Sequence, residues 1–230
     1  MGCVTIFVLS VNENTRFDRL MDQIATEFPR FRIVRKSDSW FQRVIHVALV
    51  VMTLGQMRSY LDGYYTTIGK TLYVTEWWDR CNSDERYITL CHELIHLRQF
   101  RRYTPPLMGV LYLLIPLPMG LAFFRAKFEK EAYAETLRAT QECYGNAAIR
   151  GDSLRERILS QFTSASYGWM WPFRKHLERW YDSECSKLEA ATPNTQRVNQ
   201  GENMAKPTST SDGSDRDDDE GNESGGRCDV

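Results

Sequence analysis

The 230-residue sequence lacks several features that would place it in a familiar class. None of its six cysteines forms a C-x-x-C pair, and no basic leader of a secretory signal opens the chain. We therefore expect free thiols in a reducing, cytoplasmic compartment. Lysines and arginines are scattered among acidic residues rather than clustered, which argues against a nucleic-acid-binding surface. The sequence also contains no internal repeat.

Composition divides the chain into a body and a tail. Hydrophobic residues make up 42% of the sequence, enough for one substantial core, so residues 1–189 are predicted to form a single domain. Residues 190–230 hold nine acidic and four basic residues and few apolar ones. Such a segment buries too little to offset its ordering entropy, and we predict a disordered acidic tail.

Histidine is scarce and unevenly placed. The chain has four histidines, and two of them, His92 and His96, flank Glu93 in the segment H-E-L-I-H. Four residues advance an α-helix by slightly more than one turn, so both imidazoles stand on one face and could bind a single Zn²⁺. Glu93 lies one position round the helix, within reach of a metal-bound water that it could deprotonate.

The alternative is a helix that carries two histidines by chance. The positions around the motif, including Leu90 and Leu94, carry no charge, as expected for a helix buried through a domain. Cys91 points about 100° away from His92 and is interpreted as a core residue rather than a ligand. His46 lies on a strongly apolar segment and is interpreted in the same way.

Hydrophobic periodicity and helix-capping residues predict an α+β fold. Helices are expected over residues 14–28, 39–53, 84–101, 125–144, 152–163 and 172–188. Strands are expected over residues 3–11 and 32–35 and, as a hairpin turning at Gly69, over residues 64–75. Asn82 and Glu85 form a capping box for the helix that holds the two histidines.

Residues 103–124 contain no charged side chain over 22 positions, a length sufficient to span a bilayer. Four prolines interrupt the stretch and argue against one continuous membrane helix. An apolar hairpin packed under the metal site, or a segment lying at a membrane interface, is expected instead.

A catalytic zinc ion requires three protein ligands and one open position. After His96 no histidine follows until His176, so a carboxylate is expected to complete the set. Glu131 is the predicted ligand, and Glu135, four residues on and on the same helix face, is the predicted partner that orients a ligand histidine. A shift of register would make Glu129 the ligand. Alternatively, these acids form a solvated face paired with nearby lysines and an arginine.

These residues resemble the signatures of zincin metallopeptidases, specifically the glutamate-zincin group typified by thermolysin. The segment H-E-L-I-H matches the first signature, and residues 131–135, E-A-Y-A-E, match the second. The chain is also similar to small metallopeptidase-like proteins of bacteria and their phages, over about residues 60–145. The resemblance implies a zincin-like core with a small sheet on the histidine helix, a glutamate on a second helix, and residues 71–74 as the edge strand beside a peptide substrate. Arg98 departs from the apolar residue usual at its position.

The expected activity is zinc-dependent hydrolysis of a peptide or protein substrate, with Glu93 as general base and proton carrier to the leaving amine. Tyr133 and His176 are candidates for stabilising the oxyanion. Three other interpretations stay open: a zincin-fold metal-binding module without turnover, a peptidase associated with a membrane through residues 103–124, and a helical binding protein without metal.

Overall fold

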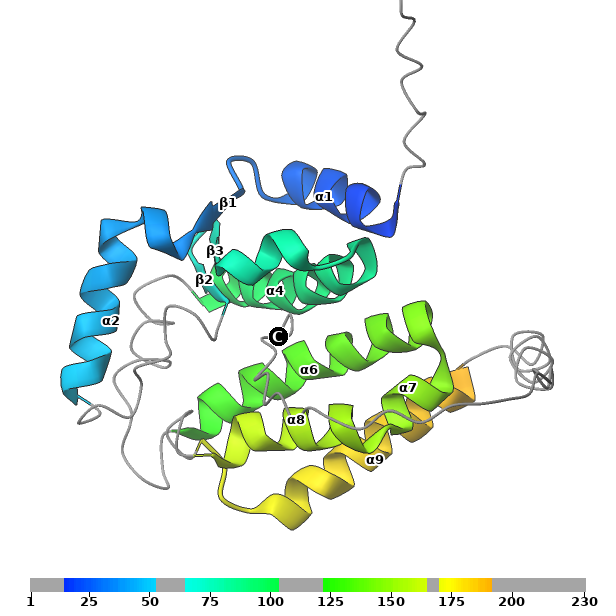
Figure 1. The fold of residues 1–230 in the computed structure, drawn as a ribbon. Coiled ribbons are helices and arrows are strands. Elements are labelled where there is room, and N and C mark those ends of the chain that lie inside the picture. Colours follow the sequence, from blue (N-terminus) through cyan, green and yellow to red (C-terminus); the bar gives the residue numbers. More distant parts are fainter. Residues whose placement is uncertain (1–14, 53–64, 104–121, 165–169, 192–230) are drawn as a thin grey trace, which may run out of the picture.

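The computed structural model describes residues 15–52, 65–103, 122–164 and 170–191. The strand expected over residues 3–11, nearly all of the uncharged stretch 103–124 and the acidic tail lie outside them. The described chain is α+β, with helices predominating and one three-stranded sheet (Figure 1).

The elements follow the chain in this order: α1 (Arg16–Glu27), β1 (Arg32–Arg35), η1 (Lys36–Asp38), α2 (Trp40–Met52), β2 (Thr66–Ile68), β3 (Thr71–Val74), η2 (Glu76–Arg80), α4 (Ser83–Tyr103), α6 (Ala122–Tyr144), α7 (Asn146–Arg150), α8 (Asp152–Thr163) and α9 (Arg174–Ala191). All six predicted helices are present, with ends shifted by a few residues. The five-residue helix α7 was not predicted from the sequence.

The sheet has the order β1-β3-β2. β1 runs parallel to β3, and β2 pairs with β3 in the predicted antiparallel hairpin. Gly69 supplies the positive φ of 62° that the tight turn requires. β3 therefore has a partner on both sides, and its expected place as the edge strand is wrong; among the described strands β1 and β2 are at the edges.

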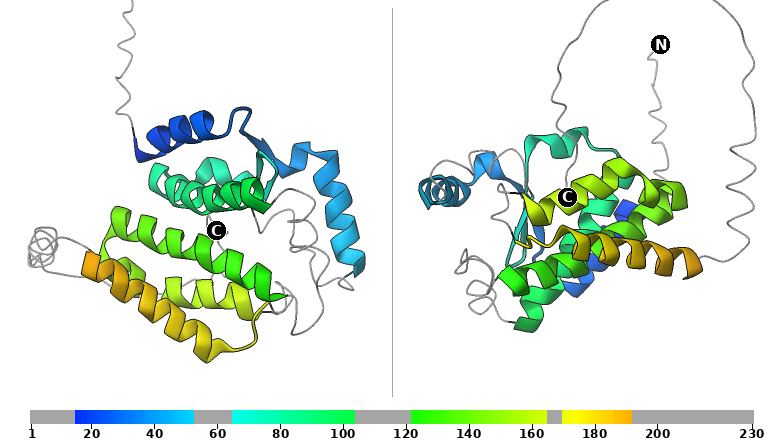
Figure 2. Two further views of the ribbon diagram at one scale, coloured as in Figure 1. Left: turned by 180° about the vertical axis from the view of Figure 1, so that it is seen from behind. Right: turned by 90° about the horizontal axis from the view of Figure 1, so that it is seen from below.

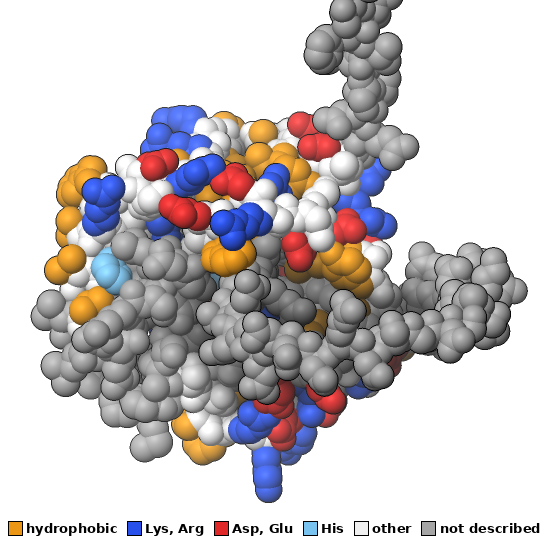
Figure 3. Space-filling model, in the orientation of Figure 1, with side chains coloured by type: hydrophobic (Ala, Val, Ile, Leu, Met, Phe, Trp, Pro, Cys, Tyr) orange, Lys and Arg blue, Asp and Glu red, His pale blue; other side chains and the backbone are white. Residues whose placement is uncertain are grey.

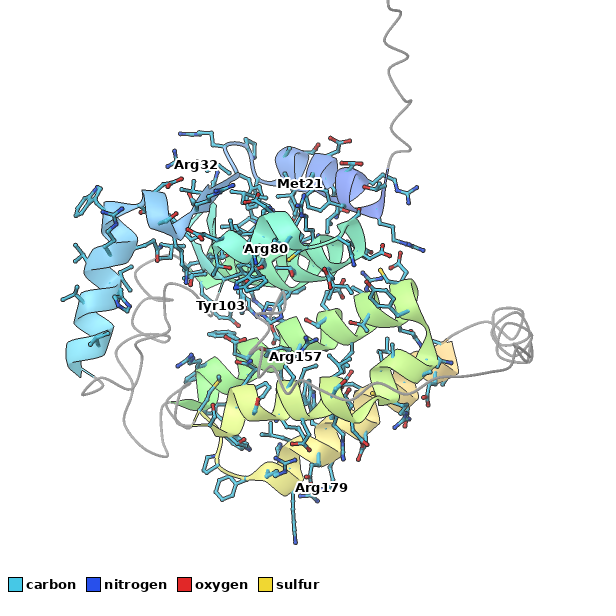
Figure 4. All side chains as sticks on the ribbon, in the orientation of Figure 1. Met21, Arg32, Arg80, Tyr103, Arg157 and Arg179 are labelled. Atoms are coloured by element: carbon cyan, nitrogen blue, oxygen red, sulfur yellow. The ribbon has the colours of Figure 1, made fainter. Side chains whose placement is uncertain are left out.

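Helix α4 lies in the middle of the molecule, between α1 on one side and α6 on the other (Figures 1 and 2). Asn82 and Glu85 cap it reciprocally: each side chain accepts a 2.9 Å hydrogen bond from the other residue's backbone N–H. The predicted capping box is confirmed. At the C-terminal end of α4 the ring of Tyr103 meets Phe128 of α6, with centroids 5.2 Å apart (Figure 4).

Two hydrophobic cores flank α6. The first joins α1, the sheet and α4, and includes the fully buried Ile24, Leu72 and Leu90. The second joins α6 to α7, α8 and α9. Helix α6 contributes Ala139 to the first core and Leu137 to the second, so it belongs to both.

The cysteine prediction holds for three described residues and fails for one. Cys91, Cys143 and Cys185 carry free thiols, and Cys91 is a core residue as expected. Cys81 is instead disulfide-bonded. Within the described segments, no helix has both the length and the apolarity needed to cross a membrane.

Candidate metal centre

Helix α4 carries the H-E-x-x-H motif in its most buried part. The residues His92, Glu93 and His96 are 4%, 5% and 7% exposed. Glu129 on the facing helix α6 is 8% exposed. Burial of two imidazoles and two carboxylates at one place is costly unless each group finds a partner.

The two imidazoles converge on one carboxylate. The Nε2 atoms of His92 and His96 lie 3.1 Å apart. The carboxylate oxygen Oε2 of Glu129 lies 3.7 Å from each of these nitrogens. These are the residues that, in the described part of the chain, could hold a metal ion together.

The structure brings Glu129, not the predicted Glu131, to the histidines. The reason is helix geometry: two residues turn an α-helix by about 200°, so the two glutamates leave α6 on nearly opposite sides. The face of Glu129 continues through Tyr133 and Thr136, which are buried. Glu131 is exposed and belongs to the other side.

Thr136 fills the orienting role that was predicted for Glu135. The hydroxyl of Thr136 lies 3.0 Å from Nδ1 of His92 and donates its hydrogen to the carbonyl oxygen of Ala132. A hydroxyl has one hydrogen to donate, so Thr136 accepts from Nδ1–H of His92. Glu135 is directed elsewhere, since its carboxylate pairs with Arg138 at 2.7 Å.

Gln99 orients the second histidine. Its amide nitrogen donates to the carbonyl oxygen of Phe128 at 3.2 Å and to the carboxylate of Glu131 at 3.0 Å. These two acceptors fix the amide orientation and direct its oxygen to Nδ1 of His96, 3.0 Å away. Nδ1 of His96 is therefore the protonated nitrogen.

Both imidazoles consequently turn Nε2, the nitrogen opposite the hydrogen-bonded Nδ1, toward the same point. Burial and, secondarily, the neighbouring His96 hold the pKa of His92 well below its usual 6.5, so His92 is neutral at neutral pH. The two Nε2 atoms and the carboxylate oxygen then face one another at 3.1 to 3.7 Å. Imidazole nitrogens and a carboxylate oxygen this close together form a donor set for a metal cation.

The spacing of these atoms suits Zn²⁺. Ligands about 2.0–2.1 Å from a tetrahedral ion are about 3.4 Å apart from one another, close to the separations observed. Two imidazole nitrogens and one carboxylate oxygen also form a donor set typical of zinc with one position left open. The residues present therefore fit a zinc ion.

Glu93 contacts the sheet rather than α6. The hydroxyl of Thr67, on the edge strand β2, donates a 2.6 Å hydrogen bond to Oε2 of Glu93. Burial raises the pKa of Glu93, and the nearby His96 and the hydrogen bond from Thr67 oppose that rise. Glu129 also raises the pKa of Glu93, which places both carboxylates in one electrostatic environment.

The two residues considered for oxyanion stabilisation lie in different places. Tyr133 packs its ring against His92, with centroids 4.7 Å apart in an edge-to-face arrangement. His176 is exposed on α9, where its ring lies 5.7 Å from that of Trp171. Of the two candidates, the structure brings only Tyr133 to the histidine pair.

Arg98, which departs from the family pattern, has a structural role. Its guanidinium binds both carboxylate oxygens of Glu27 on α1, at 2.8 to 3.3 Å. Arg101 binds the same carboxylate at 2.8 Å. The polar residue thus fastens α1 to α4 on the side of α4 that faces away from α6.

The sequence pattern contains a signal that would have identified Glu129. Residues 131, 135, 138 and 142 are all charged and recur at helical spacing, which is typical of a solvated face with internal ion pairs. Glu129 instead shares its face with small, aromatic and hydroxyl side chains. Gln99 and Thr136 carry no comparable signal, because single polar residues on buried helices are common.

Searches of known protein families, of curated proteins and of solved structures found no match to this chain. The assignment of the centre therefore depends on the geometry of its own residues.

Proposed function

We propose that this protein is a zinc-dependent peptidase of the zincin type, with the metal held by His92, His96 and Glu129. The observation that carries the proposal is the convergence of two imidazole nitrogens and a carboxylate oxygen at 3.1 to 3.7 Å. Hydrogen bonds that His92 and His96 donate to Thr136 and Gln99 maintain that arrangement. Its zincin-like core comprises the small sheet, α4 with the motif, and α6 with the glutamate.

The reaction assigned to this centre is hydrolysis of a peptide bond by water. A zinc ion held by His92, His96 and Glu129 would supply a Lewis acid for the scissile carbonyl and would lower the pKa of a water toward about 7. Glu93 accepts the proton of the attacking water and transfers it to the leaving amine nitrogen. Its raised pKa suits both steps, because the carboxyl group must hold the proton between them.

The edge strand β2 is the element best suited to hold an extended substrate. It pairs with β3 on one side only among the described strands, so its other backbone groups could pair with a peptide. β2 also carries Thr67, whose hydroxyl holds Glu93. A peptide bound along β2 would therefore lie beside the general base.

The decisive test is Glu93→Gln, which preserves shape and removes the base. The wild-type protein should bind one zinc per chain and cleave an unfolded protein such as reduced casein, and a chelator should stop cleavage. The variant should retain one zinc and lose cleavage by at least about a hundredfold. Cleavage at the wild-type rate by Glu93→Gln would refute the assigned role.

A second candidate is a metal-binding module without turnover. The observation that favours it is the burial of the centre, since all four residues are at most 8% exposed. One zinc per chain with no cleavage of any unfolded protein would support this candidate. A chain that binds no zinc at all would exclude both.

A further inference from the structure

Exposed apolar side chains of the described residues form two groups. Seven of the eight large ones lie either on α2 or around Trp171; the eighth, Tyr144, lies at the opposite end of α6. Figures 1 and 2 show α2 at one side of the molecule, apart from the first turns of α6 and α9. Figure 3 shows the hydrophobic side chains of α2 exposed there.

The group around Trp171 combines aromatic rings with cations. Phe123 contacts Trp171 with ring centroids 6.1 Å apart, and Phe173 contacts Trp171 at 5.7 Å. Phe123 and Phe173 are 52% and 60% exposed. A cavity of about 480 Å³ opens between the Trp171 ring and the start of α9, where Lys175 and Arg179 line it. Arg179 projects from the outer side of α9 (Figure 4).

The cations of this group have no acidic partner within the described residues. Lys175 and Arg179 are exposed and enter no ion pair there, and Lys127, four residues after Phe123 on the same face of α6, is also exposed. Arg174 differs, because Glu156 and Glu178 neutralise it. The potential is positive enough to lower the pKa of His176 through Lys130 and, less strongly, Arg179.

We propose that Phe123, Trp171 and Phe173, with Lys127, Lys175 and Arg179, form an aromatic–basic surface that docks on an anionic lipid bilayer. Aromatic rings favour the interfacial region of a bilayer, and lysine and arginine bind anionic headgroups there. This role is independent of the zinc centre.

Two other occupants fit the same surface less well. A second copy of the chain would bring apolar rings but would set the same unpaired cations opposite one another. The acidic tail would bring negative charge, but residues 190–230 hold few apolar side chains to cover the rings. A bilayer interface offers both an apolar medium and anionic groups.

The sequence next to the surface has matching chemistry. The uncharged stretch 103–124 ends with the exposed Phe123 and Phe124. Helix α2 carries a second exposed apolar stripe, with Trp40, Val44 and Val47 spaced along one helix face and 74%, 54% and 60% exposed.

The experiment is co-sedimentation of the full-length protein with vesicles of phosphatidylcholine, alone or with about 30% phosphatidylserine. Binding should require phosphatidylserine and fall as salt is raised. Lys127→Glu with Lys175→Glu should weaken binding by at least about 25-fold, at about fivefold per charge. Phe123→Ser with Phe173→Ser should weaken binding by about tenfold or more per ring.

The matched controls lie at the other ends of the same helices. Tyr144→Ser on α6 and Lys187→Glu on α9 should bind vesicles as the wild type does. Circular dichroism of every variant checks folding, and all altered side chains are exposed. Absence of binding to phosphatidylserine vesicles would overturn the proposal, as would equal losses in controls and surface variants. The surface would instead serve self-association if the wild type bound no vesicles and formed a dimer. In that case the double variant Phe123→Ser with Phe173→Ser should be a monomer.

Discussion

Gln99 donates a 3.0 Å hydrogen bond to Glu131, and by doing so it is held with its oxygen toward His96. Glu131 therefore acts on the candidate centre through an intermediary and does not touch the imidazoles. The same amide also donates to the backbone of α6 at Phe128. Glu131, which the sequence predicted as a ligand, is thus the hydrogen-bond partner of Gln99, the residue that positions His96.

Replacing each glutamate separately distinguishes a ligand from a supporting residue. Glu129→Ala should reduce zinc affinity by at least about a thousandfold, because one of three protein ligands is lost. Glu131→Ala should reduce zinc affinity by about tenfold, since Gln99 keeps its bond to Phe128. Competition with a chromophoric chelator measures both. A larger loss for Glu131→Ala would restore Glu131 as the ligand.

The hydrogen-bond partners of the imidazoles should affect metal affinity without any contact with the metal. Thr136→Val removes the acceptor of His92 Nδ1–H with little change in volume, and Gln99→Met does the same for His96. Each should weaken zinc binding by about 10- to 100-fold. Thr140→Val, one turn along α6 and similarly buried, is the control and should bind zinc as the wild type does. Unchanged affinity in Thr136→Val would contradict the orienting role.

Local sequence signals predicted the helices well because capping residues mark where helices begin and end. Asn82 with Glu85 marks the start of α4, and Gly145, with a φ of 80°, marks the end of α6. Helix α7 was not predicted because five residues are too few to show a helical hydrophobic period. The order of the strands in the sheet was not predicted for a different reason. The register within a hairpin is set locally, whereas the parallel pairing of β1 with β3 joins segments 39 residues apart, such as Arg32 with Thr71.

The identity of the third ligand depends on how α6 is rotated against α4, which is set by packing of the whole molecule. Glu129 and Glu131 are equivalent in helix propensity and charge. The spacing of the charged residues 131, 135, 138 and 142 favours Glu129, and the burial of Ala132, Thr136 and Ala139 on α6 shows which side meets α4. The H-E-x-x-H pair needed no such information, because its geometry is contained in one helix.

The ion pair between Glu27 and Arg98 predicts a stability difference that depends on pH. The hydrogen bond from Arg98 holds the pKa of Glu27 below its usual 4.5 in the folded protein. The stabilisation is therefore complete above about pH 4.5 and is lost as pH falls through the lower, folded pKa. The wild type should exceed Glu27→Gln by about 1 kcal/mol in free energy of unfolding at pH 7, with the difference vanishing in acid.

Urea unfolding at several pH values measures this difference. Subtracting the two proteins removes the contribution of every other carboxylate. A difference that grew on acidification would be opposite in sign to the expected one and would show that the pair does not stabilise α1 on α4.

The two cores should unfold together, because α6 is part of both. Leu90→Ala in the first core and Leu137→Ala in the second remove side chains with no exposed surface. Each should cost about 2–5 kcal/mol and lower the midpoint of one common transition, seen equally by tryptophan fluorescence and far-UV circular dichroism. Two separate transitions, each sensitive to one variant, would divide residues 1–189 into two domains.

Because the candidate centre lies at the junction of α4 and α6, metal binding there should affect the stability of the whole protein. His92 and His96 belong to the half built on the sheet, whereas Glu129 belongs to the helix shared with the C-terminal half. A cation bound by residues of both halves would hold α4 and α6 together. By mass action it would add about 2.7 kcal/mol to the free energy of unfolding at a free concentration of 100 times its dissociation constant. Chelation would then remove this stabilisation from the single transition in which both cores unfold.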